Sequence, residues 1–551
     1  MKFHLHITFI ILFIQLALEN VHAQINKQQK EEINITSSFK PSIIKSPKLE
    51  FRPDAILRDT TRYKFSYEPV KLSFSTPMSG FTIKPLAYAA PTKEIDGNQF
   101  IAQMGYGNLK SPFGSLSYAS SKADQFLQLN ADYFSMKGKL PDQQHAIGTI
   151  GASYKKRISE NYQYKLGARV ENFNYRNYGY DRTIYVNVPL EELKQKYTNF
   201  NVNAALNNVA GEEGKINVNP TFALDFLTTN RKYNTLSSSI EMPTYFNWKK
   251  GFTFKSVPSF SWLHVNAVQR SFVDDIFLLK LPVSAEMIHQ NWVFNLTALP
   301  AYFNKQLKFM PNIFLKHILN DGKWHLKGGF QSIYEINSPY KILLQNSFVH
   351  PMLNSISPVY EQHYLFAGFD LHSKNGYSID IETGATQHKN IPLFINNGLI
   401  GKDFLTIFES SLRTIDVKSS FTYFLNHRLT FSSDLKWTSF QRQVMYEKPF
   451  GMLPFQWGVK TTWKPIEKLT LLFNSSFWTG SYANNSVSTV KLSTVADINL
   501  HFKYNLNDKW GFWLDLNNIA NVQYQRWNQY TAYGFNFIGG IKYVLGKPVK
   551  Q

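Results

Sequence analysis

The sequence contains no cysteine, and this absence excludes several classes of protein at once. Disulfide scaffolds and thiolate metal centres both need cysteine, and so does a lipid anchor carried on an N-terminal cysteine. Long apolar runs are also absent after residue 23, where no segment approaches the roughly 18 continuous apolar residues of a membrane-spanning helix. If this chain crosses a membrane, it must cross with strands.

Motifs for catalysis and cofactor binding are missing as well. The sequence has no glycine-rich phosphate loop of the Walker or dinucleotide type, and no nucleophile stands beside a marked base. The histidines of the mature chain are dispersed without the spacing of a metal site; they include His145, His264, His325, His363, His388 and His501. We therefore expect no enzymatic activity, no cofactor and no metal site.

The first 23 residues have the pattern of an export signal. Lys2 supplies the basic start, Ile7 to Leu18 form an apolar core, and Val21-His22-Ala23 provide a small-residue ending. Such a segment is too short to span a bilayer and is removed after export. The sequence predicts cleavage near Ala23.

Aromatic residues make up 16% of the chain, with 45 Phe, 30 Tyr and 11 Trp, yet the chain has no long apolar run. A chain this rich in aromatic residues but without apolar runs places its apolar side chains at alternate positions along strands, as β-barrels do. A large soluble all-β protein shares the composition. The net charge is +20, but the 59 basic residues are spread out without a basic block. We expect no nucleic-acid partner; a solvated lumen and loops facing anionic ligands or lipopolysaccharide phosphates explain the charge better.

Apolar and polar residues alternate along most of the chain from residue 98 onward. In Leu429–Thr438, large apolar side chains occupy one set of alternate positions and polar or charged side chains the other, and Phe535–Leu545 repeats the pattern. A period of two with charges on one face is typical of a membrane strand with lipid outside and water inside. The charged residues expected to line the lumen are Lys165, Arg169, Asp434, Lys436, Asp497 and Lys503. They could line a ligand path or form a salt-bridged network that holds a wide barrel in shape.

Short polar turns and long loops alternate between these strands. The predicted turns are 121–124, 157–161, 210–214, 247–251, 289–291, 319–323, 373–376, 426–428, 465–468 and 505–509. The longest predicted loops are 177–197, 337–361, 391–411 and 518–532, and all fall on the side opposite to the turns. Ten turns and eleven loops give an antiparallel all-β barrel of about 22 strands of the outer-membrane type, with both ends in the periplasm. Counting Lys341–Val349 and Phe404–Leu412 as further strands would give 24.

The expected domains follow from this count. They are a signal peptide (1–23), a periplasmic segment that is extended or partly luminal (24–97), the transmembrane barrel (98–546) and a C-terminal tail (547–551).

The end of the chain resembles TonB-dependent receptors. Asn518, Asn521 and Tyr524 stand in an Asn-aliphatic-x-Asn-x-x-Tyr run that leads into a loop and a final aromatic strand, GFNFIGGIKYVLG. The strands, rich in Phe and Tyr, are similar to those of receptors of the Bacteroidetes group. The resemblance implies a large N-terminal plug and a TonB-contacting box, whereas about seventy residues precede the barrel here and no such box is recognisable.

Two functions stay open from the sequence. The first is a receptor or transporter that takes up or passes a solute across the outer membrane of a Gram-negative cell. The alternative is a structural or assembly scaffold whose barrel binds periplasmic and surface partner proteins. Either would be inserted by the barrel assembly machinery among outer-membrane lipid and lipopolysaccharide. The resemblance adds TonB as a partner, and the scaffold alternative adds periplasmic or surface lipoproteins.

Overall fold

The computed structural model describes residues 97–546, apart from 184, 186, 209–215, 250, 268–271, 304, 320–322, 351–358, 374–375, 399–401, 427 and 485–487. The predicted signal peptide, the tail and nearly all of the predicted periplasmic segment lie outside these residues.

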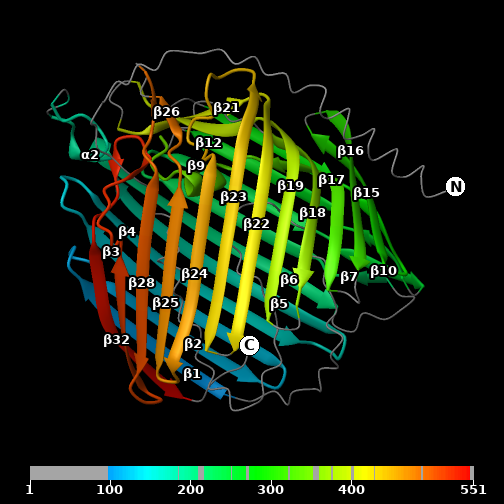
Figure 1. The fold of residues 1–551 in the computed structure, drawn as a ribbon, viewed down its shortest axis with the longest axis horizontal. Coiled ribbons are helices and arrows are strands. Elements are labelled where there is room, and N and C mark those ends of the chain that lie inside the picture. The colour runs from blue at the N-terminus through cyan, green and yellow to red at the C-terminus, as the bar shows by residue number, and fades with distance from the viewer. Residues whose placement is uncertain are drawn as a thin grey trace. The chain divides into compact units, whose positions relative to one another are not determined.

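One antiparallel sheet contains most of the described residues (Figure 1). Its first half consists of β1 (Gly97–Gly107), β2 (Phe113–Lys122), β3 (Gln125–Lys137), β4 (Gln144–Arg157), β5 (Tyr162–Arg176), β6 (Lys194–Asn208), β7 (Ile216–Val218), β8 (Thr221–Thr229), β9 (Tyr233–Glu241), β10 (Thr244–Lys249), β11 (Phe252–Ser256), β12 (Ser259–Ala267), β13 (Phe272–Lys280) and β14 (Val283–His289). Its second half consists of β15 (Trp292–Phe303), β16 (Gln306–Leu319), β17 (Trp324–Ile336), β18 (Val359–His372), β19 (Tyr377–Lys389), β22 (Leu412–Asn426), β23 (Leu429–Gln443), β24 (Phe455–Ile466), β25 (Leu469–Trp478), β28 (Val495–Asn505), β29 (Trp510–Asn517) and β32 (Asn536–Gly546).

The sheet closes on itself through β1 and β32, which pair from Gln99 opposite Gly546 to Gly107 opposite Ile538. Glycines allow the two strands to approach closely, because a Cβ on Gly540 would lie 2.0 Å from the carbonyl oxygen of Met104. Four strands of the wall are interrupted and appear as two segments each: β7 with β8, β9 with β10, β11 with β12, and β13 with β14. Counted as single strands, they complete a closed barrel of 22 strands, which confirms the predicted fold class.

A proline causes each of the four interruptions, since its ring leaves no N–H for the strand ladder. Two further prolines, Pro300 in β15 and Pro311 in β16, lie at nearby positions on the adjacent strands. Proline carbonyls still accept bonds from the next strand, as in Leu206 N–H to Pro220 (2.9 Å) and Asn219 N–H to Pro243 (2.8 Å). We call this row of prolines the proline seam; its members are Pro220, Pro243, Pro258, Pro282, Pro300 and Pro311.

The two ends of the barrel differ as the turn count predicts. All ten predicted turns join strands at one end, called here the turn end, and the eleven loops lie at the other, called the loop end. The five longest loops are β5–β6 (177–193), β17–β18 (337–358), β19–β22 (390–411), β25–β28 (479–494) and β29–β32 (518–535). The four loops predicted to be longest are among them.

The loops contain local structure of their own. They hold the hairpins β20 (Ile391–Asn396) with β21 (Phe404–Glu409), β26 (Tyr482–Asn484) with β27 (Thr489–Lys491), and β30 (Gln525–Trp527) with β31 (Tyr530–Thr531), besides the helices α2 (Leu190–Leu193) and α3 (Pro339–Gln345). The two segments that could have raised the strand count to 24 are therefore not additional strands of the wall. Lys341–Val349 contains most of α3 and a turn, and Phe404–Leu412 contains β21 of a loop hairpin and the first residue of β22. Among the described residues, neither helix has the length and apolar character needed to span a bilayer.

Side chains alternate between the two faces of the wall. On β32, Phe537 and Ile541 are 41% and 38% exposed, whereas Asn536 and Lys542 are each 3% exposed. The exposed positions form the apolar outer face and the buried ones the inner face, as expected for a barrel in lipid.

Candidate functional site at the loop end

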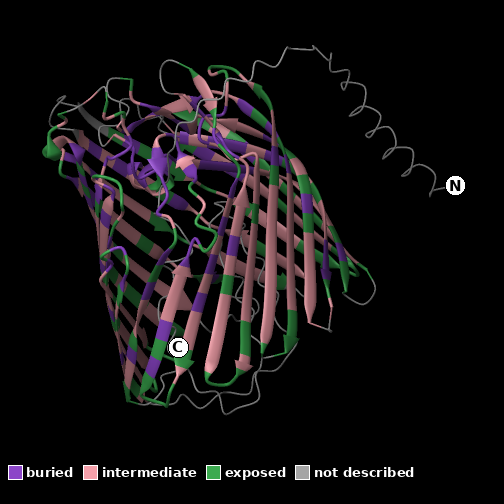
Figure 2. Cartoon of the chain, turned by 60° about the vertical axis from the view of Figure 1, so that its left-hand side comes forward, coloured by how far each residue is buried: buried purple, intermediate pink, exposed green. Residues whose placement is uncertain are grey.

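Four long loops share one buried apolar core at the loop end of the barrel. Side chains from the β5–β6, β17–β18, β19–β22 and β29–β32 loops pack against inner-wall residues of β5, β6 and β8. Figure 2 shows buried residues gathered at this end. The loops therefore fold inward over the opening. We call this core the loop cluster; its members are Tyr175, Tyr178, Tyr197, Leu227, Ile342, Leu343, Phe348, Val349, Phe394, Phe404, Trp527 and Tyr530.

Tyr530 lies at the centre of the loop cluster and is fully buried. Its ring centroid lies 3.9 Å from that of Phe348 and 5.0 Å from that of Tyr178. Phe404, from a further loop, lies 5.7 Å away, and the Tyr530 hydroxyl donates a hydrogen bond to the Lys402 carbonyl. One side chain of the β29–β32 loop thus joins the three other loops of the cluster.

Arg526 places a positive charge beside the same aromatic core. Its guanidinium lies 4.1 Å from the centroid of the Trp527 ring, and its Nη2 donates to the Gly451 carbonyl at 2.9 Å. Burial lowers the pKa of Arg526 to about 10, which leaves it charged at neutral pH. Its Nη1 is buried and has no hydrogen-bond partner among the described residues.

The predicted family motif forms the base of the β29–β32 loop. Asn518 is fully buried in a left-handed conformation (φ 47°). Its side-chain amide donates to the carbonyls of Val522 (2.9 Å) and Tyr533 (3.0 Å), and its oxygen accepts from Val522 N–H (3.0 Å). Asn521, also left-handed, accepts from Phe535 N–H at 2.8 Å. Both asparagines tie the start of the loop to its end.

Tyr524, the third motif residue, reaches a residue predicted to line the lumen. Its hydroxyl donates to Asp497 at 3.1 Å, and Trp478 packs edge-on against its ring at 5.4 Å. Burial raises the pKa of Tyr524 well above its ordinary value, so it stays a neutral donor. The motif and the inner wall therefore meet at this hydrogen bond.

Glu409 of the β19–β22 loop fastens one further loop through its fully buried carboxylate. Oε1 accepts from the backbone N–H of Ser411, Val444 and Met445, and Oε2 accepts from Met445 and Tyr446, at 3.0–3.2 Å. Charge-assisted bonds to backbone amides are among the stronger ones in proteins. They fasten the β23–β24 loop (444–454) to hairpin β20–β21.

The other predicted inner-wall charges are not gathered into one site. They lie on β5, β23 and β28, no two of which are paired in the sheet. Arg169 lies 2.5 Å from Glu171, which accepts a hydrogen bond from Tyr340 of α3, and Lys165 is exposed. Asp434, Lys436 and Lys503 are half-buried.

Three buried carboxylates organise hydrogen-bond networks between β16 and β23, and no sequence pattern marks them. Glu361 accepts from Lys308, Lys389 (2.6 Å) and His363 (2.8 Å). Glu382 accepts from Tyr364 (2.8 Å) and Lys418 (3.0 Å). Asp416 accepts from three threonine hydroxyls, those of Thr386, Thr414 and Thr438, at 2.7–2.8 Å. These contacts link side chains of neighbouring strands to one another.

A closed barrel of 22 strands has the size known from large outer-membrane transporters. No family model matches the sequence, and no curated protein matches it significantly. Solved structures do match, at low sequence identity. The FrpB iron transporter of Neisseria meningitidis aligns with a TM-score of 0.64 and 8% identity over 82% of each chain.

Two receptors match similarly, one of them the siderophore receptor PirA. PirA of Acinetobacter baumannii aligns with a TM-score of 0.60 and 9% identity over 83% of this chain and 81% of its own. The ferric enterobactin receptor PfeA of Pseudomonas aeruginosa aligns with a TM-score of 0.60 and 9% identity over 82% and 81%. The chain therefore has the barrel fold of these outer-membrane proteins, which are receptors or transporters.

Proposed function

We propose that this protein is an outer-membrane barrel that binds a solute at its loop end and passes it through the lumen. The observation that carries the proposal is the loop cluster, in which four loops of a 22-stranded barrel pack inward around Tyr530. A barrel of this size encloses a wide lumen that must be closed to keep the envelope intact. Inward-packed loops can close the lumen and bind a solute, because they restrict the opening and present side chains to the outside.

The location of the protein is part of the proposal. The chain is exported, cleaved near Ala23 and inserted into the outer membrane, with the loop end outward and the turn end in the periplasm. Contacts with lipopolysaccharide, the barrel assembly machinery and TonB belong to the same proposal. The apolar outer face supports insertion into lipid.

The positive charge of Arg526 at the loop cluster indicates which class of solute would bind there. Arg526 places this charge beside the Trp527 ring, which suits an anionic or oxygen-rich solute with an apolar part. FrpB is an iron transporter and PirA a siderophore receptor, and both descriptions are compatible with a solute of this kind.

Planar bilayers test the proposal directly. Removing the central ring with Tyr530→Ala should cost about 3–5 kcal/mol of packing at the cluster and loosen the loops. We expect the variant to conduct ions severalfold more than the wild type, while Tyr530→Phe keeps the ring packing and behaves almost as the wild type. If Tyr530→Ala forms a heat-modifiable barrel that conducts no more than the wild type, the loops do not control passage, and a scaffold role is then the better account.

A further inference from the structure

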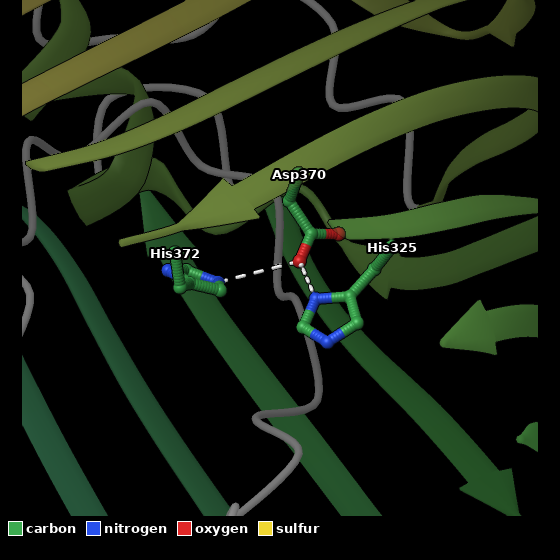
Figure 3. Close-up of side chains that lie close together, drawn as sticks. All are labelled: His325, Asp370 and His372. Carbon is green, nitrogen blue, oxygen red and sulfur yellow. Dashed lines mark hydrogen bonds and ion pairs between the residues drawn. The ribbon is translucent and has the colours of Figure 1, made fainter. Parts of the chain in front are cut away.

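Three side chains with metal-ligating atoms converge on the inner wall near the turn end of β17 and β18 (Figure 3). His325 stands directly opposite Asp370 in the strand pairing, and His372 follows two residues later on the same face. Asp370 Oδ2 lies 2.5 Å from His325 Nδ1 and 3.3 Å from His372 Nε2. One carboxylate oxygen thus bridges two imidazoles.

The spacing of these atoms suits a transition-metal ion. One nitrogen or oxygen from each residue lies within 4.8 Å of the others. Neighbouring ligands on a tetrahedral zinc ion, each about 2.0–2.1 Å from the metal, are ~3.4 Å apart. Small side-chain rotations would place the three atoms around one ion, and water would fill the remaining position. Two imidazoles with one carboxylate form a donor set that also binds iron(II) in proteins.

The exposure of one ligand and the burial of the other two also favour metal binding. The His372 side chain is 50% exposed, whereas those of His325 and Asp370 are only 9% and 7% exposed. Two ligands are therefore held in place by packing, and the third is open to an arriving ion. The strand pairing that positions them is part of the closed wall, so the group needs no loop movement to form.

Lys316 of β16 is a cation that competes for the same carboxylate. Its Nζ lies 3.5 Å from Asp370 Oδ2. A bound metal would have to share or displace this contact, because two positive charges at one carboxylate oxygen repel each other. The competition predicts that removing the lysine strengthens metal binding.

We propose that His325, Asp370 and His372 form a binding site for one divalent transition-metal ion of the zinc type. The site lies on the inner wall at the turn end, remote from the loop cluster, and is independent of whichever solute that cluster binds. A bound ion would cross-link β17 and β18 at the turn end, where β17 follows the turn from β16 and β18 precedes the turn to β19.

Zinc titration of the purified full-length barrel in detergent tests the site, with binding followed by calorimetry or by competition with a chromophoric chelator. Thiolates cannot contribute because the chain has no cysteine. We expect one Zn²⁺ to bind per barrel in the micromolar range or tighter. His372→Ala should weaken this binding at least tenfold, and the half-exposed position keeps the substitution from disturbing the fold.

Two further variants sharpen the result. Lys316→Met should raise the affinity severalfold by removing the competing ammonium. His264→Ala serves as the matched control, because His264 pairs with Asp275 across adjacent strands at 3.0 Å but has no second histidine in the group. It should leave zinc binding unchanged.

The proposal is overturned if His372→Ala binds zinc as tightly as the wild type, or if the wild type binds no better than a His325→Ala, His372→Ala double variant. Equal heat-modifiable gel mobility of all variants confirms that each comparison is made on folded barrels. Cobalt(II) gives a second readout, since its visible spectrum reports nitrogen and oxygen ligands at the site directly.

Discussion

Asn518 shows how a single side chain can set the path of a long loop. It occupies a left-handed conformation that few residues other than glycine and asparagine adopt easily, and its amide closes the loop base with three hydrogen bonds. The sequence predicted the motif from resemblance alone. Its physical reason, a buried amide linking the two ends of the loop, needed the structure.

Replacing this amide should release the base of the loop. Asn518→Ala leaves buried carbonyls without donors, which costs about 1–3 kcal/mol. We expect protease cleavage within 518–535 at enzyme concentrations that leave the wild type intact. Gln523→Ala is the control, because Gln523 is exposed within the same motif. Equal protection of the Asn518→Ala and Gln523→Ala variants would contradict the assigned role.

Asp403 gives the loop cluster a pH dependence. This fully buried loop residue accepts a bond from Asn397 at 2.8 Å and lies 3.9 Å from His350, yet burial raises its pKa above the ordinary value. The folded state therefore holds a proton more readily than the unfolded state. Its contribution to stability is present at acid pH and is lost as the pH rises through the folded-state pKa.

Thermal unfolding of the wild type and Asp403→Asn between about pH 4 and pH 7 measures this effect. The wild type should lose stability relative to the variant as the pH rises over this range. Parallel curves for the two proteins would show that Asp403 carries no such linkage.

At the scale of elements, strands and turns were predictable and loop structure was not. Alternation and polar turns are local signals, so every predicted turn joins strands in the barrel. Helix α3 carries a local signal of another kind: Ser338 accepts from Lys341 N–H at 3.2 Å and Pro339 begins the helix. These capping residues explain why the segment from Lys341 does not form another strand.

The loop cluster and the carboxylate networks depend on contacts between distant parts of the chain. His325 and Asp370 lie 45 positions apart, and only the register of β17 with β18 brings them together. The alternation of apolar and polar residues along each strand does not specify which residues of the two strands are paired. Alternation therefore predicts a face for each strand charge but not the partners that it contacts on other strands.

Glu409 provides a test of how elements are joined at the loop end. Glu409→Gln removes the charge and one acceptor oxygen that fasten the backbone of Val444–Tyr446. Bonds to a charged group contribute about 1.5–3 kcal/mol, so these amides should exchange hydrogen at least tenfold faster. Glu447→Gln, at a neighbouring side chain that is 72% exposed, is the control. Unchanged exchange in Glu409→Gln would refute the link.

For the whole molecule, the closure of the barrel can be tested with introduced cysteines, because the wild type has none. Ala102 and Tyr543 stand opposite each other across β1 and β32. The double variant Ala102→Cys, Tyr543→Cys should form a disulfide that changes its gel mobility after heating without reductant. Ala102→Cys combined with Ala496→Cys, on β28, should remain unlinked. A disulfide in neither variant would argue against this register.

The proline seam has a mechanical consequence for the whole wall. Each proline removes one hydrogen bond from the ladder, and six neighbouring strands carry the loss at nearby heights. A row of missing bonds is a row of lower bending stiffness. Under lateral pressure from the bilayer, the wall should flex first along this line, and the cross-section of the barrel should change there while the β1–β6 side keeps its curvature.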